Sequence, residues 1–205
     1  MKKLTLSIIL ILVAITASAQ KFGVTGGLTM AQFDDVREGR NPGCHAGVSL
    51  NLPLALGFAL QPELLYNVKG AVVPGVSDAK FSAGYCELGL QAQWGLDLIV
   101  AKPFILVEPY VGGRVNNSVK IDGQILQDDS LWELADRLEC GYAIGGGIEV
   151  LYNLQLSVKH FRTLGTLFDS GRINPAIGDS LPGQFEEILD GGHFTGTTVS
   201  LTYFF

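Results

Sequence analysis

Charged side chains that recur at every second position of short apolar segments are the residues best placed for chemistry. Alternate positions of an extended strand share one face, so these acids and bases are expected opposite the valines and leucines. Charges held in a narrow enclosure are costly unless they pair. The pattern therefore favours an enclosed network of ion pairs and hydrogen bonds over a proton or ion path. Its predicted members are Glu63, Lys69, Glu87, Glu108, Arg114, Glu139, Glu149 and Lys159.

Three histidines, His45, His160 and His193, could in principle serve a hydrolytic triad with the serines and acids of the chain. Such a site needs a histidine, a serine and a carboxylate within hydrogen-bond reach. Ser157 and His160 have opposite parity on their segment, and no nucleophile is evident beside His45 or His193. We therefore expect no catalytic residues and no enzymatic activity.

The sequence predicts no cofactor and no metal. The glycines at 145–147 are not followed by the Lys-Ser/Thr of a phosphate-binding loop. The acids of the later loops lack the spacing of a calcium loop. The cysteines fall on segments that are not expected to be neighbours, which argues against disulfides and against a thiolate metal site. They are Cys44, Cys86 and Cys140.

Eight segments with a period of two residues are expected to position these side chains as β-strands. In 138–150, for example, Cys140, Tyr142 and Ile144 alternate with Glu139 and Gly141. The connections alternate between long and short, with long loops at 32–42, 70–80, 117–137 and 163–192. The strands are predicted at 21–31, 43–52, 57–69, 81–94, 103–116, 138–150, from 154 to about 162, and at 193–205.

The last segment, HFTGTTVSLTYFF, indicates how such a set of strands closes. From Thr195 its alternate positions place Leu201, Tyr203 and Phe205 on one face and Phe204 on the other. Membrane barrels carry aromatic girdles, and their final strand must pair with the first to leave no edge. The predicted fold class is therefore all-β, an eight-stranded antiparallel up-and-down transmembrane β-barrel.

A soluble eight-stranded carrier is the structural alternative, because it has the same alternation with the apolar face turned inward. Parity alone does not choose between the two barrels. The glycine, glutamate and lysine on the polar face, together with the aromatic C-terminus, favour the membrane version. In that version the lipid contacts the valines and leucines.

Residues 1–19 are predicted to be a cleaved signal peptide, since Lys2 and Lys3 precede an apolar run that ends in Ala17-Ser18-Ala19. Residues 20–205 are then a single β-barrel domain. Without the two lysines, the 14 basic residues become 12 against 20 acidic ones, a formal charge of −8. This acidic balance excludes nucleic acid as an expected partner.

Several short patterns together make the chain resemble the outer-membrane β-barrel domain family called PorT-like or porin-family. They include Gln61-Pro62-Glu63-Leu64-Leu65-Tyr66, Lys102-Pro103-Phe104, Gly145-Gly146-Gly147-Ile148-Glu149 and the terminal Tyr203-Phe204-Phe205. The resemblance implies a monomer in the Gram-negative outer membrane. It also implies contact with outer-membrane lipid and recognition of the C-terminal strand by the barrel assembly machinery.

An eight-stranded wall leaves an interior about wide enough for side chains alone. We therefore expect a plugged lumen and a structural or interaction role in the envelope, with an envelope protein as a further partner. The alternatives are a narrow porin-like channel, a small-solute or lipid-binding barrel, and, less favoured, a lipid-modifying hydrolase. Long outer loops commonly carry recognition, so the loop at 163–192, together with the loop at 117–137, is the expected binding surface. Its expected binding residues are Phe168, Arg172, Phe185 and Glu186.

Overall fold

The computed structural model describes residues 20–33, 40–72, 80–121, 124–126, 138–164 and 194–205. Almost all of these residues lie in strands. The predicted signal peptide 1–19, His193 and the predicted loop residues Phe168, Arg172, Phe185 and Glu186 fall outside them. Within the described residues, no helix is long and apolar enough to cross a membrane.

Nine strands and one short 3-10 helix, η1 (Ala55–Gly57), make up the described chain. The strands are β1 (Lys21–Phe33), β2 (Arg40–Pro53), β3 (Phe58–Val72), β4 (Lys80–Gly95), β5 (Ala101–Ile121), β6 (Gln124–Leu126), β7 (Leu138–Val150), β8 (Leu154–Thr163) and β9 (Phe194–Phe204).

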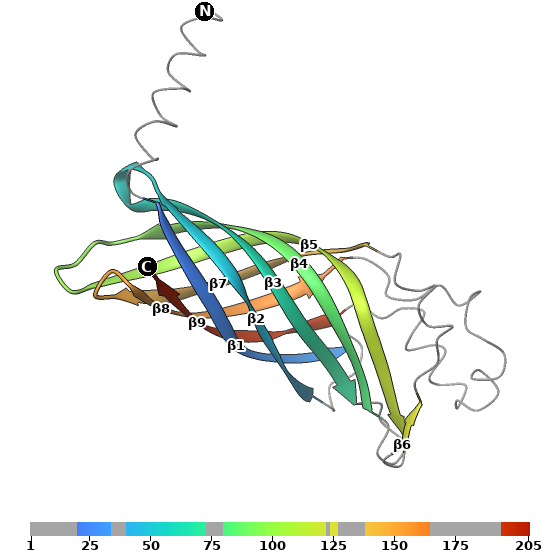
Figure 1. Ribbon diagram of the computed structural model, residues 1–205. Helices are drawn as coiled ribbons and strands as arrows, with labels where there is room; N and C mark the ends of the chain where they lie inside the picture. Colours follow the sequence, from blue (N-terminus) through green and yellow to red (C-terminus); the bar gives the residue numbers. More distant parts are fainter. Residues whose placement is uncertain (1–19, 34–39, 73–79, 122–123, 127–137, 165–193) are drawn as a thin grey trace, which may run out of the picture.

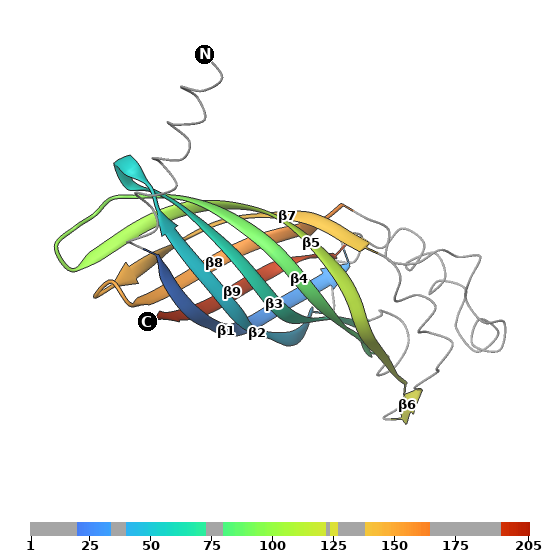
Figure 2. The ribbon, with the colours of Figure 1, turned by 45° about the horizontal axis from the view of Figure 1, so that its top comes forward.

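Eight of these strands close into a ring (Figure 1). Each strand pairs antiparallel with its neighbour along the chain, β4 pairs with β5, β5 with β7, and β9 returns to β1. Thr25 lies opposite Thr202 at this closing seam. The start of β1 and the end of β9 lie at the same end of the barrel (Figure 2). The prediction of an eight-stranded up-and-down barrel is confirmed.

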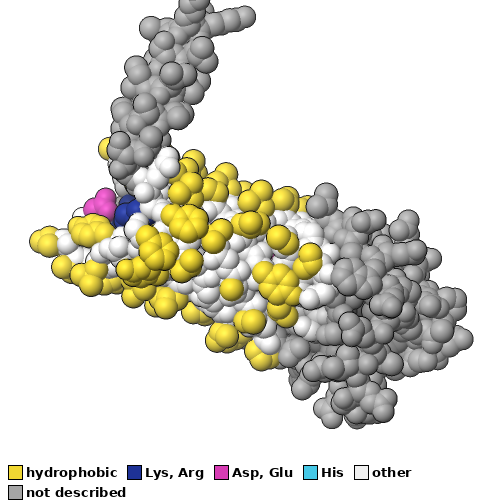
Figure 3. All heavy atoms as spheres, in the orientation of Figure 1, with side chains coloured by type: hydrophobic (Ala, Val, Ile, Leu, Met, Phe, Trp, Pro, Cys, Tyr) yellow, Lys and Arg dark blue, Asp and Glu magenta, His cyan; other side chains and the backbone are white. Residues whose placement is uncertain are grey.

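The alternation along each strand decides which side chains face out. On β8, Leu154, Leu156 and Val158 are exposed, while Gln155 and Ser157 between them are buried. The same arrangement recurs around the ring, so apolar side chains cover the described outer wall (Figure 3). The valines and leucines therefore face away from the barrel axis, which is the reverse of a soluble carrier.

Exposed aromatic side chains gather near the end of the barrel that holds both termini. Phe58 lies opposite Trp94, and the rings of Phe22 and Phe205 stack with centroids 6.5 Å apart. Tyr203 packs edge-on against Phe205 at 5.3 Å. This ring of Phe22, Phe58, Trp94, Tyr203 and Phe205, the aromatic girdle, is the arrangement expected at one membrane boundary.

Of the two terminal aromatics, only Phe205 belongs to this girdle. Phe205 is 72% exposed, whereas Phe204 is fully buried inside the barrel, on the inner face that the alternation predicts. Phe104 fills a second part of the same end, where the missing side chain of Gly147 leaves room for its ring. Two buried aromatic rings therefore fill part of the interior at the end that holds the termini.

The structure corrects several strand ends. β5 continues to Ile121 and forms a hairpin with β6, although 117–137 is predicted as a loop. β2 begins at Arg40 and β3 reaches Val72, inside two other predicted loops. These extensions either begin at a glycine or interrupt the apolar alternation with polar residues, and sequence patterns assign such segments to loops. Ladder pairing satisfies the backbone whatever the side chains are, so the strands continue.

The start of β9 contains one further correction. Thr195 is predicted on the lipid face, but Phe194, Thr195 and Gly196 are all buried in succession. The hydroxyl of Thr195 donates to the backbone oxygen of Phe161 on β8, at 3.2 Å. A bond to the neighbouring strand thus holds this side chain against the wall.

Candidate functional site

The interior of the barrel is organised around two buried lysines, each held between two glutamates. Lys69 pairs with Glu87 and Glu139, and these three residues are called the Lys69 cluster. Lys159 pairs with Glu63 and Glu108, which together form the Lys159 cluster. Five strands supply these side chains: β3, β4, β5, β7 and β8. Side chains from five consecutive strands of the ring therefore meet in the interior.

In the Lys69 cluster, the lysine amine is enclosed by carboxylates and aromatic rings. Its Nζ lies 2.6 Å from Glu87 Oε1 and contacts Glu139 Oε1. The same nitrogen lies 4.9 Å, 4.9 Å and 5.0 Å from the ring centroids of Tyr85, Tyr110 and Phe161. Each ring face attracts a cation. A lysine that is 1% exposed is thus compensated by contacts from five other residues.

Polar side chains extend this cluster along the wall. Thr163 donates to Glu139 Oε1 at 3.0 Å, and Tyr110 lies 3.0 Å from the hydroxyl of Thr163. On the other side, the amide nitrogen of Asn67 donates to Glu87 Oε2 at 3.0 Å. Buried charges are retained at lower cost when their remaining hydrogen-bonding positions are filled.

The Lys159 cluster lies nearer the end that holds the termini. Lys159 Nζ is 2.6 Å from Glu108 Oε2 and 3.2 Å from Glu63 Oε2. The other oxygen of Glu63 accepts from Gln61 at 2.8 Å and from Ser49 at 3.0 Å. Every one of these groups is buried.

Uncharged polar residues continue this cluster across the lumen. Gln61 Oε1 accepts from Asn51 at 3.1 Å and from Gln93 at 3.0 Å, and Gln93 also donates to Gln91. Hydrogen bonds of 2.6 Å and 2.8 Å link Thr25 to Ser49 and to Thr202. The cross-section at this level is filled by hydrogen-bonded side chains.

A chain of hydrogen bonds with a defined direction leads from Glu87 to His45. Because a carboxylate only accepts, the bond from Asn67 to Glu87 fixes the orientation of the Asn67 amide and turns Oδ1 toward Thr29. The Thr29 hydroxyl donates to that oxygen at 2.7 Å, so it accepts from His45 Nδ1 at 3.0 Å. In the neutral ring, His45 Nε2 then accepts from Ser200, at 2.9 Å.

The contact between His45 and Ser200 corrects one expectation, since the sequence shows no nucleophile beside this histidine. The serine lies on β9, 155 positions away. The pair is not a hydrolytic triad, because Thr29 and not a carboxylate occupies the other ring nitrogen of His45. His160 is exposed, 3.4 Å from the hydroxyl of Thr195, while Ser157 faces inward as predicted.

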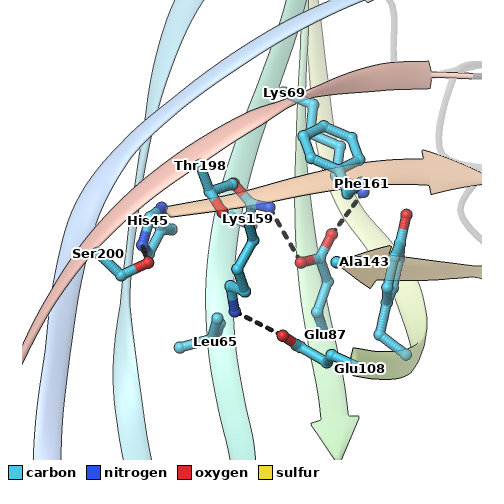
Figure 4. A pocket seen from close by; sticks show the side chains of 12 residues that line it. His45, Leu65, Lys69, Glu87, Glu108, Ala143, Lys159, Phe161, Thr198 and Ser200 are labelled. Atoms are coloured by element: carbon cyan, nitrogen blue, oxygen red, sulfur yellow. Dashed lines mark hydrogen bonds and ion pairs between the residues drawn. The ribbon is translucent and has the colours of Figure 1, made fainter. Parts of the chain in front are cut away.

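A small cavity separates the two lysine clusters (Figure 4). Its volume is about 30 Å³, and its lining includes His45, Lys69, Glu87, Lys159 and Ser200. A buried water molecule needs roughly 10–15 Å³ by this measure. The cavity therefore has room for about two water molecules and for no organic ligand.

The remaining predicted site residues, Glu149 and Arg114, are also buried. Glu149 does not join the lysine clusters. It pairs with Lys21 at 2.6 Å, and Lys21 also donates to the backbone oxygen of Tyr152, at 2.7 Å, at the end that holds the termini. Lys21 is a partner that parity places on the polar face but that sequence reasoning did not include in the site.

Sequence reasoning also missed most of the uncharged partners. Gln61 and the aromatic cage of Lys69 carry no pattern that sets them apart from other inward positions, and their role follows only from the closed ring. Thr29 and Asn67 have inward parity, which was the one available signal. Among the described residues, no group of three or more histidine, cysteine or acidic side chains is placed to hold a metal ion. The three cysteines are free and exposed.

Comparison with known proteins gives one family match. The family model described as an outer membrane protein beta-barrel domain matches residues 18–180. No curated protein matches the chain.

Several solved structures resemble the whole barrel at low identity. Neisserial surface protein A is 10% identical, over 91% of this chain and 97% of that chain, with a TM-score of 0.48. Ail, the attachment invasion locus protein of Yersinia pestis, is 10% identical over 90% and 96%, with a TM-score of 0.44. The outer membrane enzyme PagL is 12% identical over 88% and 98%, also with a TM-score of 0.44.

The family model covers most of the chain, and the closed ring has the apolar exterior that a membrane barrel requires. The resemblance seen in the sequence is thereby confirmed at the level of the family. This chain belongs to the outer membrane protein beta-barrel domain family.

Proposed function

We propose that this outer-membrane barrel is closed by its own side chains and serves a structural or interaction role in the envelope. The observation that carries the proposal is the pairing of Lys69 and Lys159 with four glutamates contributed from around the wall. Moving a hydrated solute through the lumen would require these buried pairs to separate. Breaking a buried pair leaves an uncompensated charge and costs about 3–5 kcal/mol.

The same geometry argues against a lumen enzyme. Ser200 is 2% exposed, and the cavity beside it holds about 30 Å³. No acyl group could reach the hydroxyl without dismantling the network. His45 also lacks the carboxylate partner that activates a histidine as a general base. The proposed role is therefore not enzymatic.

The proposed interaction surface is the loop that contains Phe168, Arg172, Phe185 and Glu186. Its support is the architecture: a plugged barrel offers the cell chiefly its loops, and loops on a rigid scaffold are the usual carriers of recognition. The expected partner is another envelope protein. The expected assembly partners are outer-membrane lipid and, through the C-terminal strand, the barrel assembly machinery. The barrel is proposed to be a monomer.

Solute efflux from proteoliposomes tests the plugged lumen. Purified, refolded protein is reconstituted in phosphatidylcholine vesicles loaded with a small fluorescent dye. We expect the dye to be retained as in protein-free vesicles. Efflux that rises in proportion to the protein content would overturn the proposal and favour the narrow channel.

A second experiment tests the loop. Phe168, Arg172, Phe185 and Glu186 are replaced by serine, and the native envelope is treated with a lysine-reactive cross-linker. We expect the cross-linked partner band of the unaltered protein to be lost while the heat-modifiable barrel band is kept. A matched variant carries four serines at 96–99, in the exposed connection between β4 and β5 at the opposite end of the barrel, and should keep the partner band. Equal cross-linking in both variants contradicts the assignment of this loop.

A further inference from the structure

Two prolines interrupt the barrel wall on either side of one residue. Pro62 on β3 lies opposite Leu90 on β4. On the other edge of β4, the ladder to β5 pairs Gly89 with Tyr110 and Ala92 with Val107, without pairing the two residues between. The unchanged register places Pro109 opposite Leu90. Proline has no N–H and is poorly tolerated inside a sheet. The two strands that flank Leu90 therefore each lack a backbone N–H donor at the position opposite this residue.

The outer surface at this point is hollowed. A groove of about 360 Å³ is lined by Pro62, by Leu88 to Leu90 and by Pro109 to Val111. Leu88, Leu90 and Val111 are exposed, and their side chains form its walls. Apart from the backbone and Tyr110, which faces inward, the lining is entirely apolar. The groove therefore selects a hydrocarbon and offers nothing to a polar headgroup.

The position of the groove determines what reaches it. Leu90 lies four residues from Trp94 of the aromatic girdle, which is about 13 Å along the strand at roughly 3.3 Å per residue. This places the groove inside the apolar belt, where it is continuous with the lipid-facing surface of the barrel. The surroundings at that depth are acyl chains.

The floor of the groove is a single layer of backbone. Gly89 has no side chain, and a Cβ added there would lie 2.3 Å from Glu108 Oε1. Glu108 is the closer partner of Lys159, at 2.6 Å. Tyr110 lines both this groove and the interior cavity. An occupant of the groove would therefore be separated from the Lys159 cluster only by the strand itself.

We propose that this groove is a binding site for one acyl chain of an outer-membrane lipid, distinct from the general lipid contact of the belt. The two prolines lie on either side of Leu90 in the groove, and Leu88, Leu90 and Val111 contact the chain. The site belongs to the outer wall and does not depend on the proposed closure of the lumen or on the loop.

Photolabelling tests the site in the complete barrel. The protein is reconstituted in phosphatidylcholine vesicles that contain a small fraction of phosphatidylcholine with a diazirine in one acyl chain. After irradiation, labelled positions are mapped by mass spectrometry. Leu156 and Val158 on β8 are the matched reference, because they are 46% and 48% exposed against 56% and 45% for Leu88 and Leu90. We expect labelling of 88–90 and 109–111 to exceed the reference several-fold.

Two variants decide between a site and general contact. Val111→Trp fills the groove and should reduce the labelling of Leu88 and Leu90 to the reference level. Val158→Trp adds the same ring to β8, which β7 separates from β5, and should leave the groove labelling unchanged. Even labelling around the belt, or groove labelling that Val111→Trp does not reduce, overturns the proposal. A cross-linked dimer through β4 and β5 also overturns it, because a second copy would then be the occupant.

Discussion

Lys159 on β8 and Glu108 on β5 meet inside the barrel, with Nζ and Oε2 2.6 Å apart, although the two residues are 51 positions apart in the chain. Neither strand is the other's neighbour in the ring, since β7 lies between them. The ion pair therefore links two strands through the interior of the barrel and not along the sheet.

Removing the cation of this pair should destabilise the barrel strongly. Lys159→Met leaves Glu63 and Glu108 buried without their cation, and we expect the free energy of unfolding to fall by about 3–5 kcal/mol. Urea unfolding in phosphatidylcholine vesicles, followed by tryptophan fluorescence, measures the change. Val158→Met, one position away on the lipid face, is the control and should cost much less, because it exchanges one exposed apolar side chain for another and leaves no buried charge unpaired. Equal losses in the two variants would contradict the Lys159 cluster.

The aromatic cage of Lys69 predicts different costs for two changes at Tyr85. Tyr85→Phe keeps the ring that lies 4.9 Å from Lys69 Nζ, and it removes a buried hydroxyl that has no hydrogen-bond partner among the described residues. It should be nearly neutral. Tyr85→Leu removes the ring face and should cost about 2 kcal/mol more, the value of a desolvated cation–π contact. The same unfolding assay compares them, and a costly Tyr85→Phe would show that the hydroxyl matters and not the ring.

The sequence predicts which side chains enter the interior of the barrel but not which of them pair with one another. Parity along each strand is a local property, so the inward position of Glu63, Glu108 and Lys159 follows from a period of two. Their pairing does not, because Lys159 and Glu63 are 96 residues apart and the match depends on how the ring closes. The contact of His45 with Ser200 could not be predicted either, because these residues are 155 positions apart and meet only in the closed ring.

The strand ends and the loops show the limit of the apolar pattern. It predicts the membrane-facing part of β5 but stops at Asn116, because the polar residues at 116–118 interrupt the apolar alternation before Val119 and Ile121. The structure continues to Ile121, since β4 and β6 provide backbone partners there. The two prolines at 62 and 109 are visible in the sequence. The sequence does not show that both prolines flank Leu90, because this depends on the register of β3 with β4 and on the register of β4 with β5.

The closing seam predicts a specific cross-link. Met30 on β1 lies opposite Thr197 on β9, and directly opposed residues have Cβ atoms roughly 4.5–5.5 Å apart. In a background with the three native cysteines changed to alanine, Met30→Cys with Thr197→Cys should form an intrachain disulfide on mild oxidation. Met30→Cys with Val199→Cys is out of register and should cross-link far less. Non-reducing electrophoresis measures both, and equal yields would mean that the ring does not close in this register.

The native cysteines should all be free thiols. Cys44, Cys86 and Cys140 are exposed on β2, β4 and β7, and none of these strands neighbours another in the ring. Alkylation of the denatured protein with iodoacetamide, without a reducing agent, should add three groups per chain by mass spectrometry. Pretreatment with a reductant should not change that number. Fewer than three alkylated thiols, rising to three after reduction, would show a disulfide and would contradict this strand order.

The closed lumen is tested most directly by current recordings across a planar phosphatidylcholine bilayer. Pure refolded protein, shown to be inserted by its heat-modifiable mobility, should produce no discrete openings above the bare membrane. Steady, reproducible steps of one amplitude from the unaltered protein would contradict the account, because ions would then be passing the Lys69 and Lys159 clusters.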